Sequence, residues 1–197
     1  MYDTFSGGLK DTLFQAREHP LKSGEKVRIR PGTADDAEAI LSIKLQILAE
    51  YVHDSLLPEE YLSDPEQEAE WIEGSLNTFD SFLAVACHKG EPVGVLYFKC
   101  SQELRCAHWG EFGMGLDRAW RGKGIGTLLL DTLFEWAENH PTVEKICLKV
   151  FDANPDAHRL YQRYGFTEEG RMLRCLKLGP DKYSDAILMG KFVKKRN

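Results

Sequence analysis

Apolar residues along the chain recur with two different periods, and these predict a series of strands and helices. Alternating or continuous apolar runs predict strands over residues 26–30, 82–88, 92–100, 104–116, 145–151, 171–178 and 183–193. Spacings of three and four residues predict helices over residues 33–48, 64–77, 124–139 and 155–164. The resulting order, β-α-α-β-β-β-α-β-α-β-β, predicts one mixed α/β domain over residues 26–197.

Residues 1–25 precede this domain and form an N-terminal appendage. Within it, residues 11–19 predict a short helix that carries Leu13 and Phe14 and is closed by Pro20. Two interpretations stay open: the appendage packs on its own domain, or it contacts a second subunit in a homodimer.

The composition narrows the class of protein. Of 197 residues, 43% are hydrophobic and 28% are charged, as is ordinary for a soluble globular protein. The formal net charge of −6 argues against nucleic-acid binding, which normally requires a basic face. No apolar run approaches the roughly 20 residues that span a bilayer, and the N-terminus lacks the layout of a signal peptide. We therefore expect a cytoplasmic protein without nucleic-acid or membrane partners.

Five cysteines occur, at positions 87, 100, 106, 147 and 175. Their odd number, irregular spacing and lack of a CxxC pair predict neither a disulfide framework nor a zinc site. We expect free thiols, in keeping with a reducing cytoplasm, and no metal.

A glycine-rich turn, Arg121–Gly122–Lys123–Gly124–Ile125–Gly126, joins a predicted strand to the most periodic helix. Glycine allows a close backbone approach and conformations that other residues resist. The first amides of a helix lack intrahelical partners and lie at the positive end of its dipole, so this turn is suited to phosphate groups.

Two other phosphate motifs do not fit. A Walker A loop needs glycine where Asp117 stands and a hydroxyl residue where Gly124 stands. A dinucleotide fingerprint reads G-x-G-x-x-G, whereas this turn reads G-x-G-x-G. A glycine turn without a ligand remains the alternative for this motif taken alone.

Two blocks together resemble a known family. Arg121-x-x-Gly124-x-Gly126 resembles the acyl-CoA-binding signature, R/Q-x-x-G-x-G/A, of the GCN5-related N-acetyltransferases (GNAT). The downstream element of that family, N-x-x-A-x-x-L-Y-x-x-x-G-F, is matched by Asn154, Ala157, Leu160, Tyr161, Gly165 and Phe166. The resemblance runs from about residue 26 to residue 192. It implies the GNAT fold: a mixed, mostly antiparallel sheet of six to seven strands, with helices on both faces and a central splay between two parallel strands.

The resemblance also implies acetyl-CoA as co-substrate. The backbone of residues 114–116 would pair with the pantetheine arm, the amides of residues 122–127 would hold the pyrophosphate, and Asn154 would hydrogen-bond the arm. Arg121 and Lys123 would add positive charge at the rim. The implied cofactor-binding residues are Met114, Gly115, Leu116, Arg121, Gly122, Lys123, Gly124, Ile125, Gly126, Thr127 and Asn154.

Acetyl transfer to an amine needs an acid for the leaving thiolate and a base for the amine. The resemblance implies that the hydroxyl of Tyr161 lies near the thioester sulfur, and a phenol with a pKa near 10 stays protonated at neutral pH. Glu111 is the candidate base, directly or through a water, although a strand glutamate is often simply exposed or ion-paired. Period two places Glu111 on the face of Gly113 and Gly115, which few side chains occupy. His108 is a weaker candidate.

The acceptor is expected to be a primary amine of a small molecule or of a protein N-terminus. Residues that could line its site are Tyr51, His53, Glu59, Glu60 and Tyr61. Asp185, two residues after Tyr183, either faces the acceptor or stabilises the last hairpin. A non-catalytic acyl-CoA-binding regulatory module is the alternative function.

Overall fold

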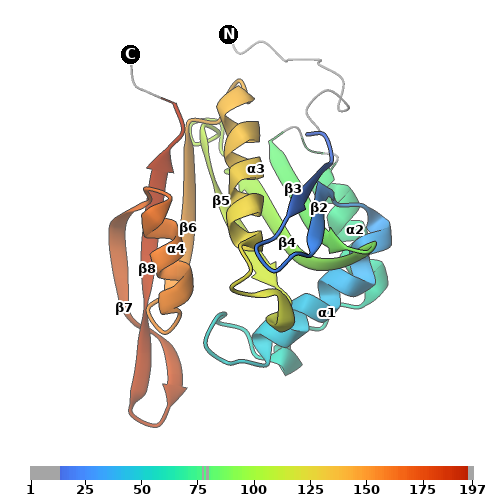
Figure 1. Cartoon of the computed structure of the whole chain (residues 1–197). Helices are drawn as coiled ribbons and strands as arrows, with labels where there is room; N and C mark the ends of the chain where they lie inside the picture. The colour runs from blue at the N-terminus through green and yellow to red at the C-terminus, as the bar shows by residue number, and fades with distance from the viewer. Residues whose placement is uncertain (1–13, 77, 79, 195–197) are drawn as a thin grey trace.

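An eight-stranded sheet forms the centre of the computed structural model, which describes residues 14–76, 78 and 80–194. The strand order is β1-β2-β3-β4-β5-β6-β8-β7 (Figure 1). Among the described strands, β5 and β6 are the one parallel pair, so the predicted mixed, mostly antiparallel sheet is confirmed. The strands are β1 (Arg17–Pro20), β2 (Lys26–Pro31), β3 (Ser81–His88), β4 (Glu91–Cys100), β5 (Trp109–Leu116), β6 (Lys145–Phe151), β7 (Thr167–Gly179) and β8 (Lys182–Phe192).

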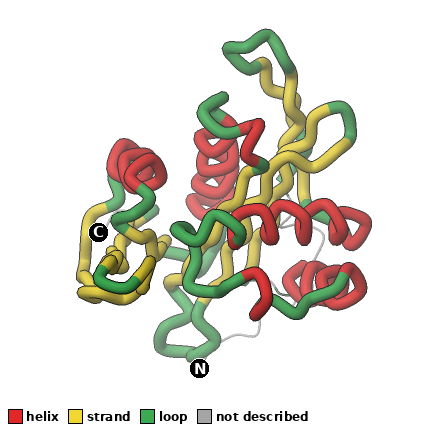
Figure 2. Tube along the Cα trace, turned by 90° about the horizontal axis from the view of Figure 1, so that it is seen from below, coloured by secondary structure: helices red, strands yellow, loops and turns green. Residues whose placement is uncertain are grey.

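Helices cover both faces of this sheet, as predicted (Figure 2). They are α1 (Ala37–Leu48), α2 (Pro65–Leu76), α3 (Ile125–Asn139) and α4 (Pro155–Arg163). Successive side chains of a strand point to opposite faces. In β3, Leu83 therefore packs in the core beneath α1 and α2, whereas Phe82 packs in the core beneath α3.

The start of α1 is held by a buried ion pair. The Asp36 carboxylate accepts hydrogen bonds from the backbone N–H of Thr33 at 2.8 Å and from Arg30 at 2.6 and 2.7 Å. The predicted capping box of Thr33 and Asp36 is present, with a short 3-10 turn, Ala34–Asp36, before the α-helix.

The predicted helix over residues 11–19 is wrong in the part that the structure describes. Residues 17–20 form β1, which pairs antiparallel with β2 and makes the sheet one strand wider than expected. Residues 11–13 lie outside the described residues. So short a helix has little stability of its own, whereas the edge of β2 supplies a ladder of hydrogen-bonding partners.

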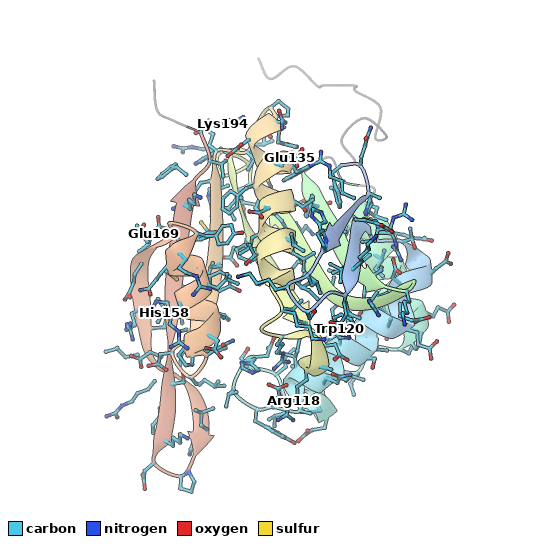
Figure 3. The ribbon with its side chains drawn as sticks, in the orientation of Figure 1. Arg118, Trp120, Glu135, His158, Glu169 and Lys194 are labelled. Carbon is cyan, nitrogen blue, oxygen red and sulfur yellow. The ribbon has the colours of Figure 1, made fainter. Side chains whose placement is uncertain are left out.

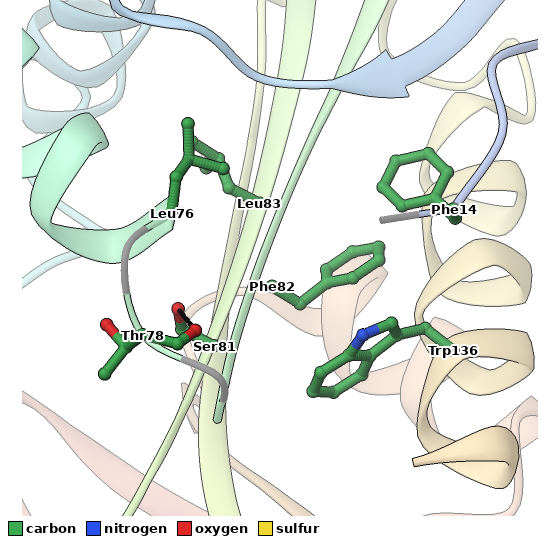
Figure 4. Close-up of a pocket in the computed structure, with 7 residues that line it drawn as sticks. All are labelled: Phe14, Leu76, Thr78, Ser81, Phe82, Leu83 and Trp136. Atoms are coloured by element: carbon green, nitrogen blue, oxygen red, sulfur yellow. Dashed lines mark hydrogen bonds between the residues drawn. The ribbon is translucent and has the colours of Figure 1, made fainter. Parts of the chain in front are cut away.

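Phe14 anchors this segment to the domain. Its ring lies 4.9 Å from the ring of Phe82, which in turn lies 5.3 Å from Trp136 of α3. These residues line a pocket of about 20 Å³ (Figure 4). That volume suits a single water molecule, so this pocket is not a ligand site.

The strand predicted over residues 104–116 begins later, at Trp109. Leu104 lies in a turn and is 78% exposed, so its apolar side chain does not mark a position in the strand. The pairing of β5 with β6 is short: it joins residues 109–111 to residues 145–147 and then stops. The second halves of the two strands part, which confirms the predicted splay.

Candidate functional site

A continuous cleft of about 1090 Å³ opens where β5 and β6 part. Its walls include residues 112–116 of β5 and residues 148–151 of β6, together with the start of α3 and one face of α4. Of the predicted site residues, the cleft is lined by Glu111, Met114, Gly115, Leu116, Arg121, Gly122, Gly124, Ile125, Gly126, Thr127, Asn154 and Tyr161.

The glycine turn forms one end of the cleft. Gly122 has φ +74° and Gly124, the N-cap of α3, has φ +93°, a region that favours glycine. A Cβ at either position would meet no atom within 4 Å, so both backbones border open space. Arg118 and Trp120 lie on the short 3-10 turn just before it (Figure 3). The free first-turn amides of α3 therefore face a space that can receive an anion.

Arg121 is bonded on two sides. Its Nε donates to the carbonyl oxygen of Leu116 at 3.1 Å, and its Nη1 donates to Glu50 Oε2 at 2.7 Å. The same Glu50 oxygen lies 2.6 Å from His53 Nε2. The hydrogen bond from Arg121 holds the pKa of Glu50 below its ordinary value. The cation expected at the phosphate rim is thus neutralised by the loop after α1.

Lys123 is the predicted site residue that does not line the cleft. Its Nζ lies 2.9 Å from Glu25 and 4.2 Å from the centre of the Trp120 ring. Glu25 precedes β2, so Lys123 ties the turn to the N-terminal segment. The sequence offered no sign of this partner, because 98 residues separate the two.

The start of α3 packs tightly against neighbouring elements. The Ile125 side chain is fully buried in the core, so only its backbone is available to a ligand. A Cβ at Gly126 would lie 3.3 Å from both Leu160 and Met114. The absence of a side chain here lets α3 approach α4 and β5 closely.

Asn154 caps α4 and also lines the cleft. Its Oδ1 accepts a hydrogen bond from the N–H of Ala157 at 3.2 Å. The amide nitrogen of the side chain has no partner among the described residues. Asn154 therefore combines a structural role with a donor that is free for a ligand.

Tyr161 lies on α4 and is 7% exposed. Its ring packs edge-on against Phe112, with centroids 5.5 Å apart. Its hydroxyl has no hydrogen-bond partner in the described part of the chain, although the residue lines the cleft. Burial raises the pKa of Tyr161 above its ordinary value, so the phenol holds its proton at neutral pH.

Glu111 is exposed at the cleft, on the face expected from period two. The expectation that few side chains occupy this face is wrong. A Cβ at Gly113 would lie 2.5 Å from the ring of Tyr97, and one at Gly115 would lie 2.7 Å from Ile47. Because the two glycines carry no side chains, Tyr97 and Ile47 pack against them and form part of the cleft wall near Glu111.

The far end of the cleft is aromatic and contains a buried ion pair. Lys44 Nζ lies 2.5 Å from Glu68, 3.2 Å from the hydroxyl of Tyr61 and 4.0 Å from the centre of the Trp71 ring. Tyr61 donates to Glu68 at 3.0 Å. Burial, reinforced by the charge of Glu68, raises the pKa of Tyr61 to about 12.

Two of the five predicted acceptor residues, His53 and Tyr61, line the cleft, whereas Tyr51, Glu59 and Glu60 do not. Sequence reasoning missed further lining residues, namely Lys44, Asp54, Trp71 and Tyr97. The sequence held one signal for these residues: Glu68 and Trp71 are three residues apart on α2, so both lie on one face of that helix.

Asp185 belongs to the last hairpin and lies outside the cleft. It accepts a hydrogen bond from the N–H of Arg174 at 2.8 Å and lies 3.3 Å from Arg171. Neither Tyr183 nor His108 lines the cleft. Of the two interpretations of Asp185, the structure supports the one in which it stabilises the hairpin.

The described residues form neither a metal-binding cluster nor a membrane-spanning helix. No group of three or more His, Cys, Asp or Glu could hold a metal ion there. Among the same residues, no helix has the length and apolar character needed to cross a membrane.

Known proteins share this fold. The model of the acetyltransferase (GNAT) family matches residues 46–166, and the chain belongs to that family. The L-amino acid N-acetyltransferase AaaT of Escherichia coli (strain K12) is 34% identical over 108 residues. That match covers 54% of this chain and 65% of the Escherichia coli enzyme.

Solved structures extend the likeness to most of the chain. A GNAT acetyltransferase from Streptococcus pneumoniae superposes with a TM-score of 0.79 and 25% identity, over 85% of this chain and 99% of that one. The yncA protein of Salmonella typhimurium, solved with its cofactor acetyl-CoA, has a TM-score of 0.77 and 19% identity. That match covers 87% of this chain and 96% of yncA, and it confirms the GNAT fold.

Proposed function

We propose that the protein is an N-acetyltransferase that moves an acetyl group from acetyl-CoA to a primary amine of a small molecule or a protein N-terminus. The observation that carries this proposal is the unpaired hydroxyl of Tyr161, a residue that is only 7% exposed. This hydroxyl has no hydrogen-bond partner among the described residues, and Tyr161 lines the cleft that begins at the glycine turn. A purely binding protein would not need an unpaired acid at that point.

The residues of the cleft fit acetyl-CoA. The open backbone at Gly122 and Gly124 and the free amides of α3 suit a pyrophosphate. The edge of β5 beyond Glu111 has no β6 partner and suits an extended amide-bearing arm, which it would bind as an added strand. Asn154 would donate to that arm through its free amide nitrogen. Lys123 does not line the cleft; it would stabilise the glycine turn through its ion pair with Glu25.

Each residue then has one task. Bound acetyl-CoA supplies an acetyl carbon that is open to attack by an amine and a thiolate leaving group. Glu111 would take the proton that the amine nitrogen loses, directly or through a water. Tyr161 would give its proton to the sulfur as the carbon–sulfur bond breaks. A backbone N–H near Met114 would stabilise the negative charge on the acetyl oxygen.

One assay tests the proposal against a regulatory module that only binds the cofactor. The protein is incubated with acetyl-CoA and a panel of polyamines, amino acids and peptide N-termini, and free thiol is measured. Amine-dependent thiol release that is at least about 10²-fold slower in Tyr161→Phe is the expected result. Saturable binding of acetyl-CoA without thiol release from any amine would overturn catalysis and leave the regulatory module.

A further inference from the structure

The turn between β6 and α4 is only three residues long, and it decides where α4 begins. Asp152, Ala153 and Asn154 lie between the last residue of β6, Phe151, and the first residue of α4, Pro155. Asn154 ends this turn at the cleft, and Tyr161 lies two helical turns further along α4. A change in the conformation of the turn would therefore displace both Asn154 and Tyr161.

All three backbone N–H groups of the turn have partners. Asn154 donates to the carbonyl oxygen of Phe151 at 2.9 Å, within the turn itself. The other two donate to β8: Asp152 to the carbonyl oxygen of Asp185 at 3.0 Å, and Ala153 to the hydroxyl of Ser184 at 3.2 Å. The conformation of the turn is thus fixed by the neighbouring strand.

The side chains complete the link. The Ser184 hydroxyl donates to Oδ1 of Asp152, and the backbone N–H of Asp185 donates to the same oxygen at 3.1 Å. Ser184 is 1% exposed, so its hydroxyl is shielded from water that could replace these bonds. A buried hydroxyl that both donates and accepts is costly to remove, because its partners are left unsatisfied.

We infer that Ser184 and Asp152 are positioning residues that set Asn154, and through α4 Tyr161, at the cleft. The inference rests on the proposed function, in which Asn154 holds the cofactor arm. It gives the last hairpin a task in acetyl-CoA binding, although that hairpin contributes no residue to the cleft wall. Neither residue lines the cleft, so both would act through Asn154.

A double-mutant cycle tests the inference, with the dissociation constant of coenzyme A measured by calorimetry on the whole protein. Ser184→Ala should weaken coenzyme A binding about five- to tenfold, the worth of one buried hydrogen bond. In the Asn154→Ala background the same change should weaken binding less than about twofold, because its effect passes through Asn154. An equal effect in both backgrounds, or no effect in either, overturns the inference.

Two further variants separate positioning from folding. Asp152→Asn keeps the oxygen that accepts from Ser184 and Asp185, so binding should stay near wild type, whereas Asp152→Ala should weaken it. Thr167→Val removes a hydroxyl that bonds β8 at Gly190, 3.3 Å away, elsewhere in the same hairpin, and should leave binding unchanged. A loss in Thr167→Val as large as that in Ser184→Ala would point to general loosening and overturn the inference. Thiol release by the wild-type protein tests the proposed function separately.

Discussion

The carboxylate of Glu50 accepts a hydrogen bond from Arg121 at 2.7 Å across 71 residues of sequence. It joins the loop after α1, which borders the proposed acceptor end of the cleft, to the turn that would hold pyrophosphate. The side chain of Glu50 is 21% exposed, so solvent screens this interaction only in part. One ion pair thus connects the loop after α1 to the glycine turn.

Removal of Glu50 should move the two substrate affinities in opposite directions. In Glu50→Ala, the charge of Arg121 is no longer neutralised, so coenzyme A should bind about three- to tenfold more tightly, as expected for ~1 kcal/mol. The KM for the amine should rise, because the loop loses its tie to the turn. Calorimetry and steady-state kinetics measure the two effects. Glu59→Ala, an exposed change in the same loop, is the control; weaker coenzyme A binding in Glu50→Ala would contradict the prediction.

Loss of the Tyr161 hydroxyl should slow chemistry without affecting binding. General acid catalysis contributes about 10²–10⁴-fold, so Tyr161→Phe should lower kcat by at least about 10². The dissociation constant of coenzyme A should stay within twofold, a margin of about 0.4 kcal/mol. Because burial raises the pKa of Tyr161, the wild-type rate should show no alkaline loss from this group below pH ~10. Tyr183→Phe, outside the cleft, should retain full activity; an equal loss there would remove Tyr161 from its role.

A side chain at Gly124 should disturb the turn through its backbone. At φ +93° an L-residue is strained, and left-handed geometry costs about 1–2 kcal/mol. Gly124→Val should therefore lower the melting temperature and abolish measurable coenzyme A binding. Gly74→Ala in α2 is the matched control: it has open space around it and no positive φ, so it should gain about 0.5–1 kcal/mol of stability. Unchanged coenzyme A affinity in Gly124→Val would sink the pyrophosphate assignment.

The sequence predicted those parts of the fold that depend on local periodicity. Helix α3, with its apolar stripe and glycine start, and β6, a short β-branched run, lie where they were expected. The strand β1 was missed because pairing with β2 outweighs weak local preference over four residues. Leu104 lengthened a predicted strand, since one exposed apolar residue cannot be told from a buried one by spacing.

The candidate site likewise has parts that the sequence predicted and parts that it did not. Backbone features, namely the glycine turn and Asn154 at the start of α4, follow from motif spacing. Partnerships between distant residues do not: Lys123 points to Glu25 because two segments far apart in sequence happen to meet there. The aromatic end of the cleft, the proposed acceptor site, is least predictable, since Trp71 and Tyr97 come from elements whose packing, rather than any motif, brings them together.

Glu111 as the base gives a prediction that separates catalysis from surface charge. Glu111→Gln removes the proton acceptor but keeps the shape of the side chain, so kcat/KM for the amine should fall about 10²-fold. The loss should shrink at high pH, where more of the amine is already deprotonated. Glu91→Gln, at the other end of the paired strands, is the control for charge. A rate that falls equally at every pH would contradict a role in deprotonation.

The ion pair at the start of α1 should make stability depend on acid pH. Burial alone would raise the pKa of Asp36, but the hydrogen bonds from Arg30 and Thr33 outweigh it and hold the pKa below its ordinary value of 3.8. A group whose pKa is lower in the folded state stabilises the fold fully above its unfolded pKa, and this contribution is lost as the pH falls through the folded pKa. The free energy of unfolding should therefore decline below about pH 4.

Asp36→Asn should remove that acid dependence and lower the free energy of unfolding at pH 7 by about 2–3 kcal/mol, because Arg30 keeps a charge that is largely buried. Denaturant titrations at pH 7 and pH 3 measure both effects. Glu135→Gln breaks the pair between Glu135 and Arg17, whose side chains are 51% and 58% exposed, and should leave the free energy of unfolding nearly unchanged. If the two variants lost the same free energy of unfolding, burial of the Asp36–Arg30 pair would add nothing to the stability that the pair contributes.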